Sequence, residues 1–574
     1  MNRDASILWL SNHSKQFHFT RSGYRRLQNN ELRVTKAFKK YEIPKQIDWS
    51  ADPFKSKSWR LYFHSLDWLH SFRFGIVNEK NSEKLEYVMS LIFDWWDNNS
   101  NPENSDSMAW DDHATSNRLA NLCFWIQMLN DSDDDKIKLI HMINFHCKKI
   151  KDFFNNGHWI ATNHAIFHIA ALINVNVVIP RKYLEINCEI LAQNYLNKTL
   201  KSIIHTDSGF SVEQSIFYHQ FVIREFKPLL EVISNSNSIN SKGIETCVNK
   251  MIYFLDLIST DSGNVPALGD TAFGFRVDPK YKNIVKGENF SFCFQETGLA
   301  IFGGRSSKGQ NIGTFSFHKD RTSHGHFSPL NFTLILDDNK VLVDSGGSYA
   351  YGEKFRFQYI VSNFAHNCIV VGGLNSKNGS NYINSKMGEI SYVTASSKSE
   401  NSEVNRTVVS LLGQLFIIFD EIYSTVDSEV DTYWHFPPNV QSISNGNTFL
   451  DISLEYQKLN KSSLSQTIVQ IADSEYVFAI SSLAPIYSSI SYGISGDQPQ
   501  GWVTPGHRKI DPAHCLKVSS DKLNSVQNST IIYNKELDYE IVSQSHDEVL
   551  ISSRRLGQIK FINGKQGLKI VTIK

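Results

Sequence analysis

The sequence predicts a two-domain α+β protein in which a helical domain precedes an antiparallel β domain. Three observations predict this class. Apolar residues recur every three or four positions before about residue 280, and they alternate every second position after about residue 290. The chain also has 574 residues, more than the roughly 250–300 that a single core usually serves. We therefore place the domains at residues 1–280 and 281–574.

The first domain is predicted from amphipathic segments. In KLEYVMSLIFDWW (84–96), Leu85, Val88, Ile92 and Trp95 fall on one helical face, and RLANLCFWIQML (118–129) repeats the pattern. Further segments of the same kind lie at 58–72, 135–150, 163–173, 183–196, 214–226 and 244–258. So many successive helices favour a toroid or solenoid over a four-helix bundle.

The second domain is predicted from period-two alternation. Phe332, Leu334 and Leu336 alternate, a turn follows at 337–340, and Val341 and Val343 resume the alternation, which is the pattern of a β-hairpin. Short Ser- and Asn-rich turns between valine, isoleucine and tyrosine runs continue to the end of the sequence. This half therefore predicts an antiparallel β-sandwich.

Charge, cysteine spacing and hydropathy argue against nucleic-acid binding, a disulfide framework and a membrane-spanning segment. The 58 basic and 58 acidic side chains leave no net charge, so there is no general field for nucleic acid or an anionic membrane. The seven cysteines form no C-x-x-C pair and predict free thiols. The first twenty residues contain no apolar run long enough for a signal peptide, and IAALINVNVVIP (169–180) is too short to span a bilayer. By sequence the protein is expected in the cytoplasm, or outside it if a leader has been removed.

Histidines and a carboxylate gather in the β half. On a strand, His324 and His326 of S-H-G-H-F would project to the same side. Asp344 follows the hairpin in V-L-V-D-S-G-G, and His366 lies in S-N-F-A-H-N. Two histidines and a carboxylate suit Zn²⁺. The alternative is chance, since the chain has 20 histidines.

The helical half offers further candidates. Gln214 and Tyr218 would share a helical face, and tyrosine can act as a general acid or base. Tyr218 could equally be a core aromatic with its hydroxyl at the rim. The pair Asn163-His164 could likewise be functional or purely structural, because asparagine is a common helix N-cap.

Taken together and in order, these segments resemble the heparinase II/III family of polysaccharide lyases over most of the chain. The helical half contributes W-D-D-H-A-T-S-N-R (110–118), T-N-H-A (162–165) and D-S-G-F-S-V-E-Q-S-I-F-Y-H (207–219). The β half contributes the H-G-H, V-D-S-G-G-S-Y-A-Y-G and F-A-H-N segments. The resemblance implies an incomplete (α/α) toroid followed by antiparallel sheets, with the active site in the cleft between them.

The resemblance also implies an activity: β-elimination beside a uronic acid in an acidic polysaccharide. Asn163 and His164 would neutralise the uronate carboxylate, Tyr218 would protonate the leaving oxygen, and either His324 or His164 would act as base. The predicted substrate contacts are Gln214, Tyr351, Arg356 and Arg118. The predicted metal ligands are His326, Asp344 and His366, and they would hold a structural divalent ion such as zinc.

Two alternatives to the lyase are open at this point. A glycoside hydrolase on a helical toroid would need two carboxylates, for which Asp111, Asp112, Glu213 and Asp270 are available. A non-catalytic polysaccharide-binding relative is the other. It is favoured by a departure from the family pattern, because Phe327-Ser328-Pro329 follows H-G-H, and proline forces the next strand to begin after it or to lie at an edge.

Overall fold

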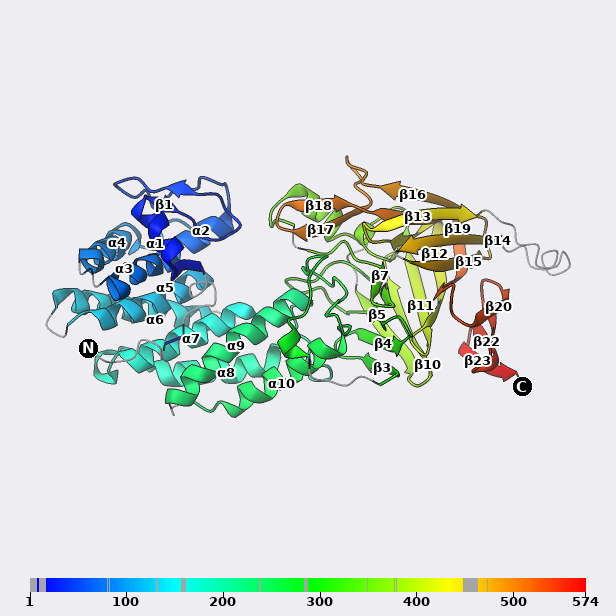
Figure 1. The fold of residues 1–574 in the computed structure, drawn as a ribbon, viewed down its shortest axis with the longest axis horizontal. Coiled ribbons are helices and arrows are strands. Elements are labelled where there is room, and N and C mark those ends of the chain that lie inside the picture. Colours follow the sequence, from blue (N-terminus) through cyan, green and yellow to red (C-terminus); the bar gives the residue numbers. More distant parts are fainter. Residues whose placement is uncertain are drawn as a thin grey trace. The chain divides into compact units, whose positions relative to one another are not determined.

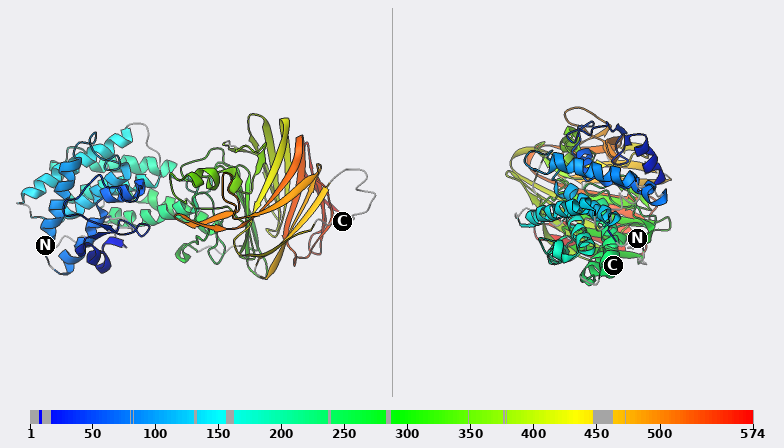
Figure 2. Two further views of the ribbon diagram at one scale, coloured as in Figure 1. Left: turned by 90° about the horizontal axis from the view of Figure 1, so that it is seen from above. Right: turned by 90° about the vertical axis from the view of Figure 1, so that its left-hand side faces the viewer.

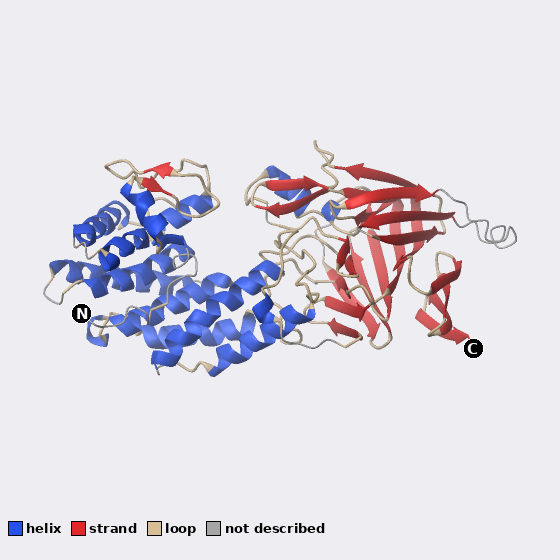
Figure 3. Ribbon diagram, viewed as in Figure 1, coloured by secondary structure: helices blue, strands red, loops and turns tan. Residues whose placement is uncertain are grey.

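Helices and strands separate along the chain as the sequence predicts (Figure 3). The computed structural model describes all residues except 1–7, 10–16, 80, 82, 131–132, 156–161, 237–238, 283–286, 348, 376, 378, 447–462, 472 and 574. Within the described chain, the last long helix ends at Leu257 and the first strand of the large sheets begins at Asn289. The predicted α+β class, helical first and β second, is confirmed.

The compact units divide the chain differently from its secondary structure. One unit contains Met1–Ile204 and Phe221–Asn249, and the other contains His205–Gln220 and Lys250–Lys574. The segment His205–Gln220, which precedes and begins a long helix, therefore packs with the β part of the chain. This assignment matters for the site, because that segment carries Tyr218.

Ten α-helices of eight residues or more lie in the described part of the first half (Figure 1). They are α1 (Arg21–Gln28), α2 (Lys57–His64), α3 (His70–Asn78), α4 (Glu83–Asn99), α5 (Asp112–Trp125), α6 (Asp134–Asn155), α7 (Asn163–Val178), α8 (Cys188–Ser202), α9 (Ile216–Ser236) and α10 (Lys242–Leu257). The two-residue strands β1 (Glu31–Leu32) and β2 (Tyr41–Glu42) form a small antiparallel pair among them. Of the described helices, none has both the length and the apolar character to cross a bilayer.

Helices α5 and α7 form the centre of the helical unit. Every residue of α5 from His113 to Trp125 is buried, and most of α7 is buried as well. Their starts are fixed by side-chain caps: Asp111 accepts from the backbone N–H groups of His113 and Ala114, and Thr162 accepts from that of His164. The caps fix where each helix begins, and both first turns carry candidate site residues.

The β unit contains three stacked antiparallel sheets (Figures 1 and 2). The first has the order β3 (Asn289–Phe294), β4 (Leu299–Arg305), β5 (Gln310–Ser316), β6 (Asn331–Leu336), β7 (Asn339–Leu342). The large sheet has the order β13 (Val440–Gly446), β14 (Ser463–Ile471), β15 (Ser474–Ser482), β19 (His514–Asn534), β12 (Leu415–His435), β11 (Ser402–Leu411), β10 (Ile390–Lys398), β9 (Ser380–Lys386). In the same sheet β16 (Ile486–Tyr492) pairs with β19, and β8 (Ile369–Val371) pairs with β12. The third has the order β20 (Tyr539–Gln544), β21 (Glu548–Ser553), β22 (Gly557–Gly564), β23 (Gly567–Ile573). Apart from these three sheets, β17 (Trp502–Gly506) and β18 (Lys509–Pro512) form a separate two-stranded sheet.

The large sheet lies between the other two because both of its faces are apolar. On one face Phe416 packs in a core with Phe332 of the first sheet, and on the other Phe419 packs in a core with Phe561 of the third. Strand residues alternate between faces, so a strand covered on both sides must be apolar throughout. Residues 415–420 of β12 are buried without interruption, as this arrangement requires.

The first sheet gathers the predicted metal residues at one end. Strand β5 ends at Ser316 opposite Asn331, where β6 begins, and β7 runs back from the turn at Asp337 and Asp338. Both turn residues have positive φ, 53° and 62°, which matches the twist of a tight hairpin. The loop that contains H-G-H and the residues that follow β7 therefore meet at the same sheet end.

Candidate functional site

A buried carboxylate, Asp270, is the centre of the site in the β unit. Its Oδ2 lies 3.0 Å from Nδ1 of His324, and its Oδ1 lies 3.0 Å from Nε2 of His326. Arg356 donates to both oxygens at 2.7 and 3.1 Å, and the hydroxyl of Tyr351 donates to Oδ2 at 2.7 Å. Burial alone would raise the pKa of this carboxyl, but the hydrogen bonds from the two histidines and the charge of Arg356 hold the pKa well below its usual value.

Tyr218 stacks on His324 beside this carboxylate. The two ring centroids are 3.5 Å apart and the ring planes differ by 9°. The hydroxyl of Tyr351 lies 3.2 Å from that of Tyr218 and 3.0 Å from Nδ1 of His324. Half of Tyr351 is exposed, yet its hydroxyl end lies among these groups, and burial there together with the nearby Tyr218 and Asp270 raises its pKa. Tyr351 therefore stays a neutral hydrogen-bond donor.

The orientation of His324 follows from the same contacts. Because Asp270 is ionised, its oxygen can only accept, so Nδ1 of His324 carries the proton that points at it. Nε2 lies 3.5 Å from Oε1 of the buried Glu213. Both nitrogens of the His324 ring therefore face a carboxylate, and these two contacts fix the orientation of the ring.

Glycines allow three separate segments to meet here. A Cβ on Gly269 would lie 2.3 Å from the carbonyl oxygen of Gln214 and 2.5 Å from that of His324, and Gly269 has φ +55°. A Cβ on Gly325 would lie 2.1 Å from Oε1 of Gln214. Contacts below 3 Å to backbone cannot be relieved easily, so the glycine of the G-D pair is what lets these chains approach, and Gly325 leaves room for the Gln214 side chain. The backbone N–H of Asp270 also donates to the carbonyl of His324 at 2.9 Å.

Three expectations about this region differ from the structure. His324 and His326 lie in the loop between β5 and β6 and not on a strand, although both still point at Asp270. Gln214 does not share a helical face with Tyr218, because α9 begins at Ile216 and Gln214 has φ +56°. Tyr218 and His324 also belong to one compact unit, whereas we expected them to come from two domains.

The predicted substrate contacts Gln214 and Arg356 are already engaged within the protein. Gln214 is buried, its Nε2 donates to the carbonyl of Asp320 at 2.7 Å, and its Oε1 accepts from the backbone N–H of Thr322 at 3.2 Å. Arg356 is 2 % exposed and donates to both oxygens of Asp270. Both side chains position the H-G-H loop and its carboxylate. Tyr351 is the predicted contact in this unit that keeps a large exposed surface.

The predicted metal ligands lie close together beyond Asp270. The rings of His326 and His366 have centroids 5.3 Å apart, and Nδ1 of His366 is 3.1 Å from Oδ1 of Asp344. Burial lowers the pKa of His326 to about 4, which keeps its imidazole neutral. Nδ1 of His326 and Nε2 of His366 are buried and have no hydrogen-bond partner in the part of the chain that the structure describes.

These donors fit a metal in chemistry but not in their present arrangement. Nε2 of His326 faces the carboxylate of Asp270, as the second nitrogen of a metal-ligating histidine usually does. However, no three His, Cys, Asp or Glu side chains among the described residues converge as a metal site would require. The zinc site stays a prediction.

A buried polar network fixes this end of the sheet. Arg406, which is fully buried, pairs with Asp420 through two nitrogens at 2.7 and 3.0 Å and donates to the carbonyls of Leu330 and Asn367. The backbone N–H of Asn367 donates to Oδ1 of Asn331, and Nδ2 of Asn331 donates to both oxygens of Asp344. The H-G-H and A-H-N segments are thereby tied to the same strands.

The helical unit contains a second carboxylate between histidines. Both oxygens of Asp112 lie 3.1 Å from Nδ1 of His164, and Oδ2 lies 3.5 Å from Nε2 of His168. Burial would raise the pKa of Asp112, but the hydrogen bonds from His164 and His168 outweigh it and lower the pKa. Asn163 is the first residue of α7, after the cap Thr162, and is 5 % exposed. Its predicted contact with substrate stays a prediction.

The structure does not support Arg118 as a substrate contact. Its side chain has no exposed surface, and its guanidinium lies over the ring of Trp95 with 3.8 Å to the centroid. It donates to Nε2 of His146 at 2.8 Å and to the carbonyl of His64 at 2.7 Å. Arg118, on α5, therefore ties together four helices of the unit, its own and α2, α4 and α6.

Two positioning carboxylates were missed by sequence reasoning. Asp112 and Asp270 were considered only as carboxylates of a hydrolase, whereas each one orients histidines. The signal for Asp270 was the G-D pair in the loop G-N-V-P-A-L-G-D-T (263–271), since a glycine beside a carboxylate permits a close approach of other backbone. Asp112 had the weaker signal of lying in the first turn of a helix.

Comparisons with known proteins were made for sequence and for fold. The family model "Heparinase II/III N-terminus" matches residues 20–286, and "Heparinase II/III-like, C-terminal" matches residues 316–509. No curated protein matches the chain. Among solved structures, a crystal structure titled heparinase III has a TM-score of 0.72 at 13 % identity and covers 100 % of this chain and 92 % of its own.

Two further solved structures have a similar fold over nearly the whole chain. The heparinase III described as the BT4657 gene product has a TM-score of 0.68 at 16 % identity and covers 99 % of this chain and 93 % of its own. The heparan sulfate lyase HepC from Pedobacter heparinus has a TM-score of 0.64 at 15 % identity and covers 100 % of this chain and 92 % of its own. At these identities the structures establish the shared fold.

Proposed function

Because the chain belongs to the heparinase II/III family, we propose that it is a polysaccharide lyase that cleaves a uronic-acid-containing polysaccharide by β-elimination. The product would carry a 4,5-unsaturated uronate at its new end. One observation carries this proposal: the ring of Tyr218 stacks on an imidazole that a buried carboxylate orients. That set can take a proton from one atom of a sugar ring and give one to another.

The reaction needs three events at one sugar. The C5–H bond breaks, its electron pair forms the C4=C5 double bond, and the C4–O4 bond breaks as O4 takes a proton. The C5 proton is weakly acidic because the adjacent carboxylate repels the developing negative charge, so donors to that carboxylate lower the barrier. Asn163 and His164 are the proposed donors, and Asp112 holds Nδ1 of His164 so that Nε2 faces away from it.

Tyr218 is the proposed proton donor to O4. Its hydroxyl lies 3.2 Å from that of Tyr351, which in turn lies 2.7 Å from Oδ2 of Asp270, so Tyr218 is positioned beside the same buried carboxylate as His324. His324 is the proposed base, since its Nδ1 is anchored on the buried carboxylate of Asp270 and its ring stacks on that of Tyr218. His164 remains the alternative base, because its Nδ1 is anchored on a carboxylate in the same way.

The geometry disfavours a hydrolase that would use Glu213 and Asp270. A glycosidase needs two carboxylates that reach the scissile bond, about 5–9.5 Å apart. The side chains of Glu213 and Asp270 are 1 % and 0 % exposed, and Asp270 is bound by four side chains. A buried carboxylate with this many partners can orient other side chains but cannot contact a sugar directly.

We also propose a structural divalent ion, zinc by its donor chemistry, at His326, Asp344 and His366. The buried nitrogens without partners support it. When bound, the ion would brace the loop ends and take no part in the chemistry. Metal analysis of the purified protein should find about one equivalent, and chelation should lower the melting temperature. His366→Ala should lose both the metal and the response to chelator. Full stability of metal-free protein would contradict the site.

The function is tested with a panel of acidic polysaccharides. Heparan sulfate, chondroitin sulfate, hyaluronan and alginate are each incubated with the protein, and the ultraviolet absorbance of the conjugated double bond is followed. Absorbance with at least one polymer supports the lyase. New reducing ends without absorbance would support a hydrolase instead, and binding without either product would support a non-catalytic relative.

A further inference from the structure

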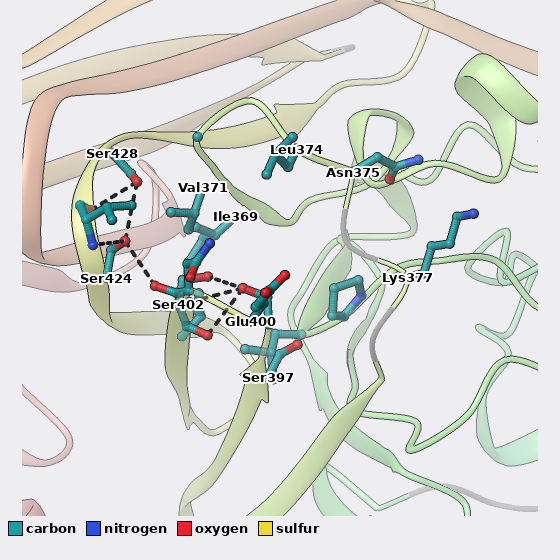
Figure 4. A pocket seen from close by; sticks show the side chains of 17 residues that line it. Ile369, Val371, Leu374, Asn375, Lys377, Ser397, Glu400, Ser402, Ser424 and Ser428 are labelled. Carbon is teal, nitrogen blue, oxygen red and sulfur yellow. Dashed lines mark hydrogen bonds between the residues drawn. The ribbon is translucent and has the colours of Figure 1, made fainter.

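A hollow of about 260 Å³ lies in the β unit, apart from the residues described above (Figure 4). Three segments enclose it: the chain after β8, the hairpin between β10 and β11, and the bend in β12 where its pairing with β19 shifts register. We call it the serine pocket, since its wall includes five serines, Ser397, Ser399, Ser402, Ser424 and Ser428. None of the residues assigned above to catalysis or to the metal lines it.

The floor of the serine pocket is aliphatic. Leu330, Ile369 and Val404 are 2 %, 8 % and 8 % exposed, and Val371 continues the same surface. No aromatic ring is among the lining residues. Such a floor accepts a small apolar group, such as a methyl, better than the broad face of a ring, which proteins usually meet with an aromatic side chain.

The rim is polar and already ordered. The hydroxyls of Ser399 and Ser402 are 2.7 Å apart, those of Ser424 and Ser428 are 3.3 Å apart, and Ser424 donates to the carbonyl of Asn401 at 3.1 Å. Hydroxyls held in this way keep lone pairs for a ligand and lose little conformational entropy when it binds. Figure 4 shows Ser402, Ser424 and Ser428 around the same hollow as Ile369 and Val371.

Charge and size narrow the ligand further. Glu400 and Lys377 line the pocket with opposite charges, so the pocket carries no net charge for a polyanion. Its volume lies just below the roughly 300–1,000 Å³ of pockets for drug-sized ligands. One sugar ring fits this space, whereas several do not.

The pocket shares its walls with the chain of the site. Pro329 and Leu330 line it and follow H-G-H by three and four residues, and Ile369 lies three residues after His366. Asn375, another lining residue, accepts from the backbone N–H of Asn363 at 2.9 Å. Pro329 is also where this chain departs from the family pattern, so the departure shapes a pocket wall while β6 begins after it at Asn331.

We propose that the serine pocket binds one uncharged sugar unit that carries an N-acetyl group, with the acetyl methyl on the aliphatic floor and the ring hydroxyls on the serines. The site would give the polysaccharide a second contact, away from the reacting bond. This role rests on the proposed function, but binding of a single sugar can be measured without any turnover.

The experiment titrates the whole protein with methyl glycosides of N-acetylglucosamine, glucose and glucuronic acid, followed by saturation-transfer NMR. The N-acetyl sugar should bind, with its strongest transfer at the acetyl methyl, and should bind more tightly than the other two. Ser402→Tyr fills the pocket and should weaken this binding about tenfold or more, as the loss of apolar cover and one hydrogen bond predicts. The double variant Ser424→Ala/Ser428→Ala keeps the floor and should weaken binding by removing two hydroxyls.

Glu403→Gln is the matched control, because Glu403 lies on the same hairpin, pairs with Lys398 and does not line the pocket. It should leave binding unchanged. Absence of binding by the wild type, no preference for the N-acetyl sugar, or equal binding by a folded Ser402→Tyr would each overturn the proposal. If the sugar binds as expected while no polymer yields unsaturated product, the lyase function fails and the pocket stands.

Discussion

The two units each contain a carboxylate between histidines, and the two clusters differ in burial. The side chain of Asp270 has no exposed surface and is also bound by Arg356 and Tyr351. The side chain of Asp112 is 34 % exposed, and that of its partner His164 is 37 % exposed. Burial with several donors encloses the first cluster, whereas the second is open to solvent. The same residue types thus form an enclosed cluster in one unit and an accessible cluster in the other.

Asp270→Asn should have the largest effect, because it breaks the enclosed cluster. The variant leaves Arg356 buried without its ionic partner, which typically lowers the free energy of unfolding by about 3–5 kcal/mol. Turnover should also fall, since His324 loses the acceptor that orients its ring. Urea denaturation and the absorbance assay measure the two effects. Asp261→Asn, which breaks an exposed pair with Arg305, is the control and should cost about 1 kcal/mol or less.

Tyr218→Phe should separate chemistry from folding in the same cluster. The ring keeps its stacking on His324, and only the proton carrier is lost. General acids and bases contribute about 10²- to 10⁴-fold, so turnover of the correct polymer should fall by that order with little change in stability. Tyr253→Phe, an exposed tyrosine of α10, should behave as the wild type. Rapid formation of unsaturated product by Tyr218→Phe would remove this residue from the mechanism.

Asp112→Asn should have a smaller effect on stability than Asp270→Asn and should change KM as well as kcat. The pair with His164 is partly exposed, and such pairs contribute about 1 kcal/mol or less. The expected loss is in the orientation of His164, a proposed donor to the uronate carboxylate. Steady-state kinetics and thermal unfolding check this, with the exposed Asp97→Asn as control. A stability loss as large as that of Asp270→Asn would show that the difference in burial does not separate the two clusters.

The smallest expected effect is a dependence on acid. The pKa of Asp112 is lowered in the folded protein, so the pair with His164 and His168 stabilises the fold above the ordinary aspartate pKa of about 3.9. This contribution is lost as the pH falls below that value toward the folded pKa. The difference in melting temperature between wild type and Asp112→Asn should therefore shrink from pH 6 to pH 3. If this difference in melting temperature instead grew between pH 6 and pH 3, the pKa of Asp112 would not be lowered in the folded protein.

The sequence determined the fold class and named the candidate residues for the chemistry. Helical and strand periods report how each segment alternates between core and solvent, and this is a local property that Val88, Ile92 and Trp95 in one helix, or Phe332 and Leu334 in one strand, already express. The separation of helices from strands was therefore predictable, as was the tight turn at Asp337. The motifs also named Tyr218 and His324, whose rings the structure brings into contact.

The tertiary structure alone decided the partners. Asp270 lies 54 residues from His324 and 86 from Arg356 in sequence, and Tyr218 lies 133 residues from Tyr351. No periodic pattern records which distant carboxylate a histidine meets, because that depends on how loops pack at the end of a sheet. For the same reason the sequence could not show that Arg118 is enclosed by helices, or that Gln214 precedes its helix in a left-handed conformation. Local burial follows from residue order, whereas the assembly of a site follows from which segments the packed core brings together.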